Sequence, residues 1–243
     1  MSIFNSNQKI GDIVAKFPNA ADIFKKYRID FCCGGDRLLI TAIKEQAINE
    51  EEILERINTS YEIFKNNIKS NDRNWLEVSF EELVDQIVNS HHAYLYENLP
   101  KISELTTKIL RVHGEKHPEL SRVHKLFHTI KMELEAHLIE EETKQYPAIK
   151  AYLLNNNETD LDKAINIIKK LQDEHTGAGN ILKELRDITN DYEAPANACT
   201  TYRLTFSKLE EMESDLFQHI HLESNILFPR LYQLKEISFA KEN

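Results

Sequence analysis

The sequence predicts an all-α protein in which a small N-terminal helical domain precedes an up-down-up-down four-helix bundle. Apolar residues recur at helical spacing along most of the chain, and no segment shows the alternation of a convincing strand. Six glycines and six prolines among 243 residues leave few helix breakers. Four long helical segments are joined by short connections, which place consecutive helices side by side and antiparallel.

The N-terminal domain is expected to occupy residues 1–69. Its first helix has an apolar face and is ended by Pro18, because proline cannot continue a helix. The expected helices lie near 10–17, 21–27, 37–46 and 50–69, with an Asp-Phe-Cys-Cys-Gly-Gly turn at 30–35. Residues 70–78 are polar, contain the only tryptophan, and are predicted to form a linker.

The bundle is expected to occupy residues 79–243. Ser79 and Glu82 have the spacing of a capping box, which predicts a helix start there. This helix should continue past Pro100 with a kink. The four expected helices lie near 79–112, 118–146, 160–190 and 200–228, the last extending past Pro229.

Charge and cysteine usage narrow the class of protein. The net charge of −10 makes nucleic acids and anionic membranes poor partners for the chain as a whole. No apolar run approaches membrane length, and the N-terminus lacks the layout of a secretory signal. Three cysteines, two of them adjacent, do not make a disulfide framework. We therefore expect a cytoplasmic protein with no membrane or nucleic-acid partner.

A repeat within the bundle carries the strongest functional signal. Two segments share a histidine, a glutamate four residues later, and a proline six residues after the glutamate. A lone histidine on the preceding helix accompanies each segment. Corresponding residues are 82 apart for the segments and 83 apart for the lone histidines. The two sets are His92 with His137, Glu141 and Pro147, and His175 with His219, Glu223 and Pro229.

These four histidines and two glutamates all fall on the apolar stripes of their helices, where residues four apart share a face. A buried imidazole or carboxylate is costly unless it is paired or metal-bound. A single His/Glu pair would more simply be a surface ion pair, and buried His–Glu hydrogen bonds without metal remain the alternative for the full set. We favour a pocket of six ligands, which suits two metal ions.

The ligand order indicates which kind of metal centre this is. Four imidazoles and two carboxylates suit iron, and also manganese or zinc. Ferritin-like bundles use Glu-x-x-His, which the chain lacks, whereas His-x-x-x-Glu is the hemerythrin-like arrangement. Glu141 and Glu223 are placed to bridge two metals, which leaves two histidines for each ion. Such a site keeps positions open for an oxo group, O2, nitric oxide or water, and it should hold iron loosely.

Several segments together resemble the Repair of Iron Centers family, which comprises bacterial hemerythrin-like di-iron proteins of nitrosative and oxidative stress. The resemblance is carried by the segments 30–35, 174–179, 198–201 and 219–229. It implies two iron ions with oxo and carboxylate bridges. The implied metal ligands are His92, His137, Glu141, His175, His219 and Glu223. The cysteine pair of the family corresponds to Cys32 and Cys33.

The resemblance implies restoration of damaged iron–sulfur clusters by iron donation, with damaged or apo iron–sulfur proteins as partners. Adjacent cysteines cannot easily bridge each other, so Cys32 and Cys33 could take iron or exchange with other thiols. The alternative is a plain turn with two incidental thiols. Nitric oxide reduction at the centre, or a gas sensor of hemerythrin type binding nitric oxide or O2, are the rival functions. On the leading hypothesis the protein is not a turnover enzyme, and the sequence leaves open whether it forms a homodimer.

The remaining polar residues carry weaker expectations. His124 and His128 are four apart, but they lie away from the His137 face, and we expect them to be surface or inter-helix residues. Glu174 either lines access to the site or is solvated. Cys199 is expected to be structural.

Overall fold

The computed structural model describes residues 3–67 and 74–242 of the chain. Within these ranges the protein is built of helices, and no strand forms beyond an isolated β-bridge between Lys9 and Leu38. The predicted all-α class is therefore confirmed. Across the same ranges, no helix is both long enough and apolar enough to cross a membrane.

The chain divides into two compact units. One unit comprises Met1–Leu83 together with Phe217–Asn243, and the other comprises Val84–Leu216. Part of the predicted linker, residues 70–73, lies outside the described residues, and residues 74–78 form a turn. The helix start expected next to it is confirmed. The Ser79 hydroxyl accepts a hydrogen bond from the Glu82 amide at 3.1 Å, and Glu82 accepts one from the Ser79 amide at 3.1 Å.

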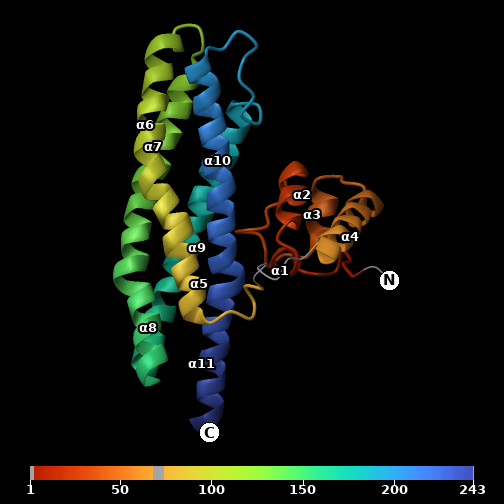
Figure 1. The fold of residues 1–243 in the computed structure, drawn as a ribbon, viewed down its shortest axis with the longest axis vertical. Helices are drawn as coiled ribbons and strands as arrows, with labels where there is room; N and C mark the ends of the chain where they lie inside the picture. Colours follow the sequence, from red (N-terminus) through yellow and green to blue (C-terminus); the bar gives the residue numbers. More distant parts are fainter. Residues whose placement is uncertain (1–2, 68–73, 243) are drawn as a thin grey trace. The chain divides into compact units, whose positions relative to one another are not determined.

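The N-terminal part of the first unit is a cluster of four helices (Figure 1). They are α1 (Ile10–Lys16), α2 (Ala20–Lys26), α3 (Leu39–Glu45) and α4 (Glu50–Asn67). An aromatic group fills part of its core: the Phe17 ring lies 5.5 Å from that of Tyr61 and 5.3 Å from that of Phe64, between centroids. As predicted, α1 ends just before Pro18.

The C-terminal part of the first unit is the end of a long helical run. The run consists of α10 (Thr200–Leu222), the π-helical turn η3 (Glu223–Leu227) and α11 (Phe228–Glu242). The expected continuation beyond Pro229 is therefore confirmed. Within this unit, α1 packs against η3.

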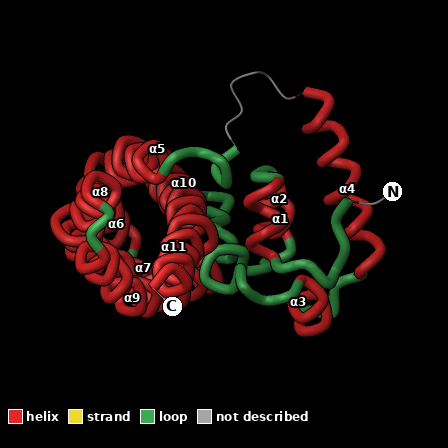
Figure 2. The backbone as a smooth tube through the Cα atoms, turned by 90° about the horizontal axis from the view of Figure 1, so that it is seen from below, coloured by secondary structure: helices red, strands yellow, loops and turns green. Residues whose placement is uncertain are grey.

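The second unit is an antiparallel bundle. Figure 1 shows α6, α7, α9 and α10 running side by side, and Figure 2 shows them around a common axis. The elements before α10 are the end of α5 (Phe80–Gln86), η1 (Ile87–His92), α6 (Ala93–His113), α7 (Glu119–Glu140), η2 (Glu141–Gln145), α8 (Tyr146–Asn155) and α9 (Glu158–Ile188). Pro100 lies inside α6, and the irregular turn of this helical run lies upstream of it, at η1.

Candidate metal centre

All predicted metal ligands are buried, with exposed fractions of 4% or less. They are His92, His137, Glu141, His175, His219 and Glu223. Their placement on the apolar stripes is thus confirmed. Because water does not reach groups buried to this degree, the cost of burying each imidazole and carboxylate has to be offset by neighbouring protein groups or by a bound ion.

π-helical turns mark three of the predicted ligands. His92 is the last residue of η1, Glu141 is the first residue of η2, and Glu223 is the first residue of η3. Such turns insert one extra residue per hydrogen-bonded ring and are frequent at functional sites. We expected ordinary helix at all three places.

The proline of each repeat explains two of these turns. Pro147 and Pro229 have no amide hydrogen, and their rings clash with the carbonyl four residues earlier. The residue before each proline instead donates five residues back: Tyr146 to the Glu141 carbonyl, and Phe228 to the Glu223 carbonyl. A glutamate placed six residues before a proline therefore starts a widened turn.

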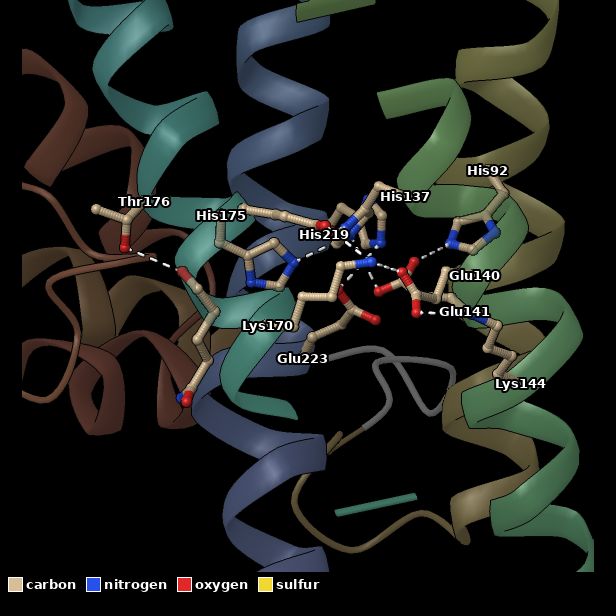
Figure 3. Close-up of polar contacts among 12 residues, drawn as sticks. His92, His137, Glu140, Glu141, Lys144, Lys170, His175, Thr176, His219 and Glu223 are labelled. Carbon is tan, nitrogen blue, oxygen red and sulfur yellow. Dashed lines mark hydrogen bonds and ion pairs between the residues drawn. The ribbon is translucent and has the colours of Figure 1, made fainter. Parts of the chain in front are cut away.

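Glu141 lies between two imidazoles of the second unit, as Figure 3 shows. Its Oε1 is 3.1 Å from Nε2 of His137, and its Oε2 is 3.3 Å from Nε2 of His92. One carboxylate thus presents each of its two oxygens to a different histidine. This is the arrangement that a bridging carboxylate requires.

Two further carboxylates bind the Nδ1 atoms of these histidines, the ring nitrogens that do not face Glu141. Nδ1 of His92 donates to Glu142 at 2.7 Å, and Nδ1 of His137 donates to Glu174 at 2.7 Å. The hydrogen bond from His137 lowers the pKa of Glu174, with Lys170 also contributing. Such partners fix the tautomer and leave the Nε2 lone pair facing inward, as in many metal-ligating histidines.

The inward-facing atoms fit a cation. Nε2 of His175 lies 3.2 Å from Nε2 of His137, and the ligand atoms of His137, Glu141 and His175 all lie within 4.8 Å of one another. Lone pairs and a carboxylate converging in a buried space repel each other unless a proton or a metal ion lies between them. This donor set of imidazole and carboxylate suits a transition metal such as iron, manganese or zinc.

The second His/Glu pair lies in the first unit. Nε2 of His219 is 3.3 Å from Oε2 of Glu223, one helical turn away, and both side chains are fully buried. Each half of the repeat therefore forms the contact that its four-residue spacing predicts.

The predicted cysteine pair is accompanied by an aspartate. Sγ of Cys32 lies 3.8 Å from Sγ of Cys33 and 3.3 Å from Oδ1 of Asp30, which also accepts the Cys32 amide hydrogen at 3.1 Å. The contact with Cys33, together with burial, raises the pKa of the Cys32 thiol well above its usual value. Cys32 is buried, Cys33 is partly exposed and Asp30 is exposed.

The remaining candidates lie elsewhere. His124 contacts Thr107 at 3.2 Å between α7 and α6, and its ring lies 4.2 Å from that of His128, so the two are inter-helix residues as expected. Cys199 is exposed and lies 3.3 Å from Nε2 of His113. Glu174 has a more specific place than expected, since it holds His137.

The sequence alone does not distinguish Glu142 or Asp30 as functional residues. Consecutive residues of a helix lie about 100° apart, so Glu142 falls outside the stripe that contains Glu141. It reaches His92 on a neighbouring element instead. Asp30 begins the turn at residues 30–35. Aspartate is common in such turns because its short side chain forms Asx turns, so its presence there does not by itself indicate a ligand.

Two family models match the chain. The model described as the hemerythrin HHE cation-binding domain matches residues 83–231, and a domain of unknown function, DUF542, matches residues 6–61. The first match spans both halves of the repeat. A cation-binding family thus matches the part of the chain that holds all six predicted ligands.

Relatives of known designation align with nearly the whole chain. A probable iron–sulfur cluster repair protein of Haemophilus influenzae is 33% identical over 95% of this chain and 99% of its own length. The iron–sulfur cluster repair protein ScdA of Staphylococcus haemolyticus is 31% identical over 90% of this chain and 95% of its own. The corresponding figures for the iron–sulfur cluster repair protein YtfE of Escherichia coli O157:H7 are 30%, 92% and 96%.

Proposed function

This chain belongs to the Repair of Iron Centers family of hemerythrin-like proteins, and we propose from that premise that it repairs damaged iron–sulfur clusters by donating iron to them. The single observation that carries the proposal is Glu141, a buried carboxylate with each oxygen facing a different imidazole. The repair assignment itself comes from the relatives.

The proposed metal centre holds two iron ions. Glu141 and Glu223 would be the carboxylates shared by both ions, and the four histidines of the repeat would complete the protein ligands. Two facts support assigning both halves to one centre: their equal spacing in the sequence, and a hemerythrin match that spans both. When bound, the pair of ions supplies redox-active iron with open coordination positions.

Weak binding of the iron ions favours a protein that donates iron over one that stores it. Six protein ligands shared between two ions leave each ion with few donors, so water or small ligands must fill the remaining positions. Ions held in this way exchange more readily than ions in a closed site. Stress by nitric oxide or oxidants, which damages clusters, is the condition in which such a donor is useful.

Cys32 and Cys33 are proposed to receive the iron during transfer. Thiolates bind iron strongly and are the usual ligands of iron–sulfur clusters. This role requires reduced thiols, which fits the cytoplasm. The partners are damaged or apo iron–sulfur proteins.

Anaerobic transfer of isotope-labelled iron to an apo cluster protein tests the proposal. The loaded wild type should restore the cluster, and the Cys32→Ser/Cys33→Ser double variant should retain its iron but transfer it more slowly. Cys199→Ser is the matched control and should behave as wild type. Equal transfer by the double variant and the wild type would remove the cysteines from the proposal, and no transfer by the wild type would overturn donation.

Nitric oxide reduction is the second candidate, favoured by the open coordination positions of a centre with so few protein ligands. It makes a different prediction. Sustained nitrous oxide production over many turnovers, independent of Cys32 and Cys33, would identify an enzyme rather than a donor.

A further inference from the structure

The turn that carries the cysteine pair brings together three potential metal ligands. The Sγ atoms of Cys32 and Cys33 and a carboxylate oxygen of Asp30 all lie within 4.8 Å of one another. We propose that these three groups form a second, mononuclear metal site, which chelates one thiophilic divalent cation. That the cation in the cell is iron in transit rests on the proposed function; the chelate itself does not.

The distance between the two sulfurs matches this chemistry. Two thiolates on one tetrahedral ion with metal–sulfur bonds of about 2.3 Å lie about 3.8 Å apart. The Sγ atoms of Cys32 and Cys33 are 3.8 Å apart. A disulfide would instead need the sulfurs at about 2.05 Å, so the two thiols are separate groups in contact, at a distance that one tetrahedral ion can span.

Asp30 supplies the third ligand on the exposed side. Its Oδ1 lies 3.3 Å from Sγ of Cys32, close to the distance of about 3.6 Å expected between oxygen and sulfur ligands of one tetrahedral ion. Two thiolates and one carboxylate suit iron(II), zinc or cobalt(II) better than magnesium or calcium. Three protein ligands leave the fourth position open, as in sites that exchange ligands.

The turn is held in place by Asn225 of η3, within the same unit. Its side-chain amide donates to the carbonyls of Phe31 and Cys32, at 3.3 and 3.0 Å. A Cβ at Gly11 or Gly35 would collide with the Asn225 side chain, so both glycines are needed for this close approach. The backbone beneath the thiols is therefore fixed before a metal arrives, which reduces the entropic cost of binding.

Binding is an exchange of protons for metal. Two thiols lose their protons to solvent as two metal–sulfur bonds form, and no oxidant or reductant takes part. Affinity should therefore rise with pH.

Cobalt(II) titration of the reduced full-length protein tests the site, because thiolate-to-cobalt charge transfer absorbs in the near ultraviolet and imidazole or carboxylate ligands do not produce that band. In the wild type the band should saturate at an intensity that corresponds to one thiolate-bound cobalt ion per chain, apart from any cobalt bound by the histidines. Cys32→Ser and Cys33→Ser should each reduce it, and the double variant should abolish it. Asp30→Asn should keep the band but weaken affinity about tenfold, because the site loses a ligand charge.

Matched controls separate the site from its surroundings. Asp36→Asn changes an exposed carboxylate of the same turn, and Cys199→Ser changes a thiol of the other unit; both should bind cobalt as wild type does. Absence of the band in a wild type with fully titratable thiols would overturn the chelate. So would an undiminished band in the double variant. The histidine centre is tested separately by iron content, so one proposal can fail while the other stands.

Discussion

The two halves of the repeat have the same types of predicted ligand but differ in the residues around those ligands. In the first half, carboxylates hold the histidines from behind: Glu142 holds His92, and Glu174 holds His137. The offsets of the repeat make Ser224 the counterpart of Glu142, and make His91, which precedes His92, the counterpart of Glu174. His91 bonds to Asp215 at 2.9 Å. The repeat thus preserves the predicted ligands but not the residue types at these two neighbouring positions.

The second half differs again just past its glutamate. Asn225 reaches out of η3 to the carbonyls of Phe31 and Cys32, whereas its counterpart Thr143 bonds to the Ile139 carbonyl of its own helix. Next to the glutamate of the first half, Glu142 therefore orients an imidazole. Next to the glutamate of the second half, Asn225 holds the turn that carries the cysteines. The predicted ligand set is thus repeated in the chain, whereas the residues next to it take different roles.

Removing a ligand from either half should have the largest effect. His137→Ala and Glu223→Ala should each eliminate most bound iron and the near-ultraviolet absorption of the proposed oxo-bridged pair, because in the proposed centre two ions share only six protein ligands. Iron content per folded chain and the absorption spectrum measure this, with circular dichroism to confirm that the helices remain. Full iron occupancy in both variants would show that the site assignment is wrong.

Removing an outer carboxylate should weaken iron binding by an intermediate amount. Glu142→Ala leaves His92 without its Nδ1 acceptor, and loss of such partners typically lowers metal affinity about 10- to 100-fold. Ser224→Ala, at the corresponding position of the second half, should cost less, because a hydroxyl carries no charge. Competition with a chromophoric iron chelator measures both. Equal losses in the two variants would mean that the halves are supported alike.

Removing the Asn225 side chain should loosen the cysteine turn. Asn225→Ala takes the amide donor away from two backbone carbonyls, which should cost about 1–3 kcal/mol of stability. Thr143→Ala is the counterpart and should stay within about 0.5 kcal/mol. Hydrogen exchange of the amides at 31–36 should quicken only in the first variant, and unchanged exchange there would show that Asn225 does not hold the turn.

Much of the fold and the ligand set could be predicted from the sequence. Helix limits at Pro18 and at the Ser79–Glu82 capping box follow from local chemistry, and the structure confirms both. The His/Glu pairs could be identified because a fixed spacing of four residues and a fixed offset of 82 need no knowledge of tertiary contacts. Their assembly into one di-iron centre stays a prediction.

The outer residues and the widened turns were harder to predict. Glu142 and Glu174 act on histidines of other helices, so their roles depend on packing and not on spacing within one helix. α-Helical and π-helical turns differ by one residue in hydrogen-bond register while using similar backbone angles and the same residue types. The proline six residues after each glutamate is the only feature of the repeat that indicates the π-helical turns. Its meaning depends on the hydrogen-bond pattern of the folded helix, which the spacing alone does not reveal.

The prolines themselves should have the smallest effect. Pro147→Ala and Pro229→Ala each restore an amide donor and remove the ring clash, so η2 or η3 can tighten to an ordinary α-turn. Tightening rotates the segment that begins with the glutamate proposed to bridge the ions, which should lower iron affinity by about tenfold or less while leaving the helices intact. Because η3 also carries Asn225, only Pro229→Ala should additionally quicken exchange at 31–36. If that variant changes iron affinity without changing exchange, the metal ligands and the cysteine turn respond to η3 independently.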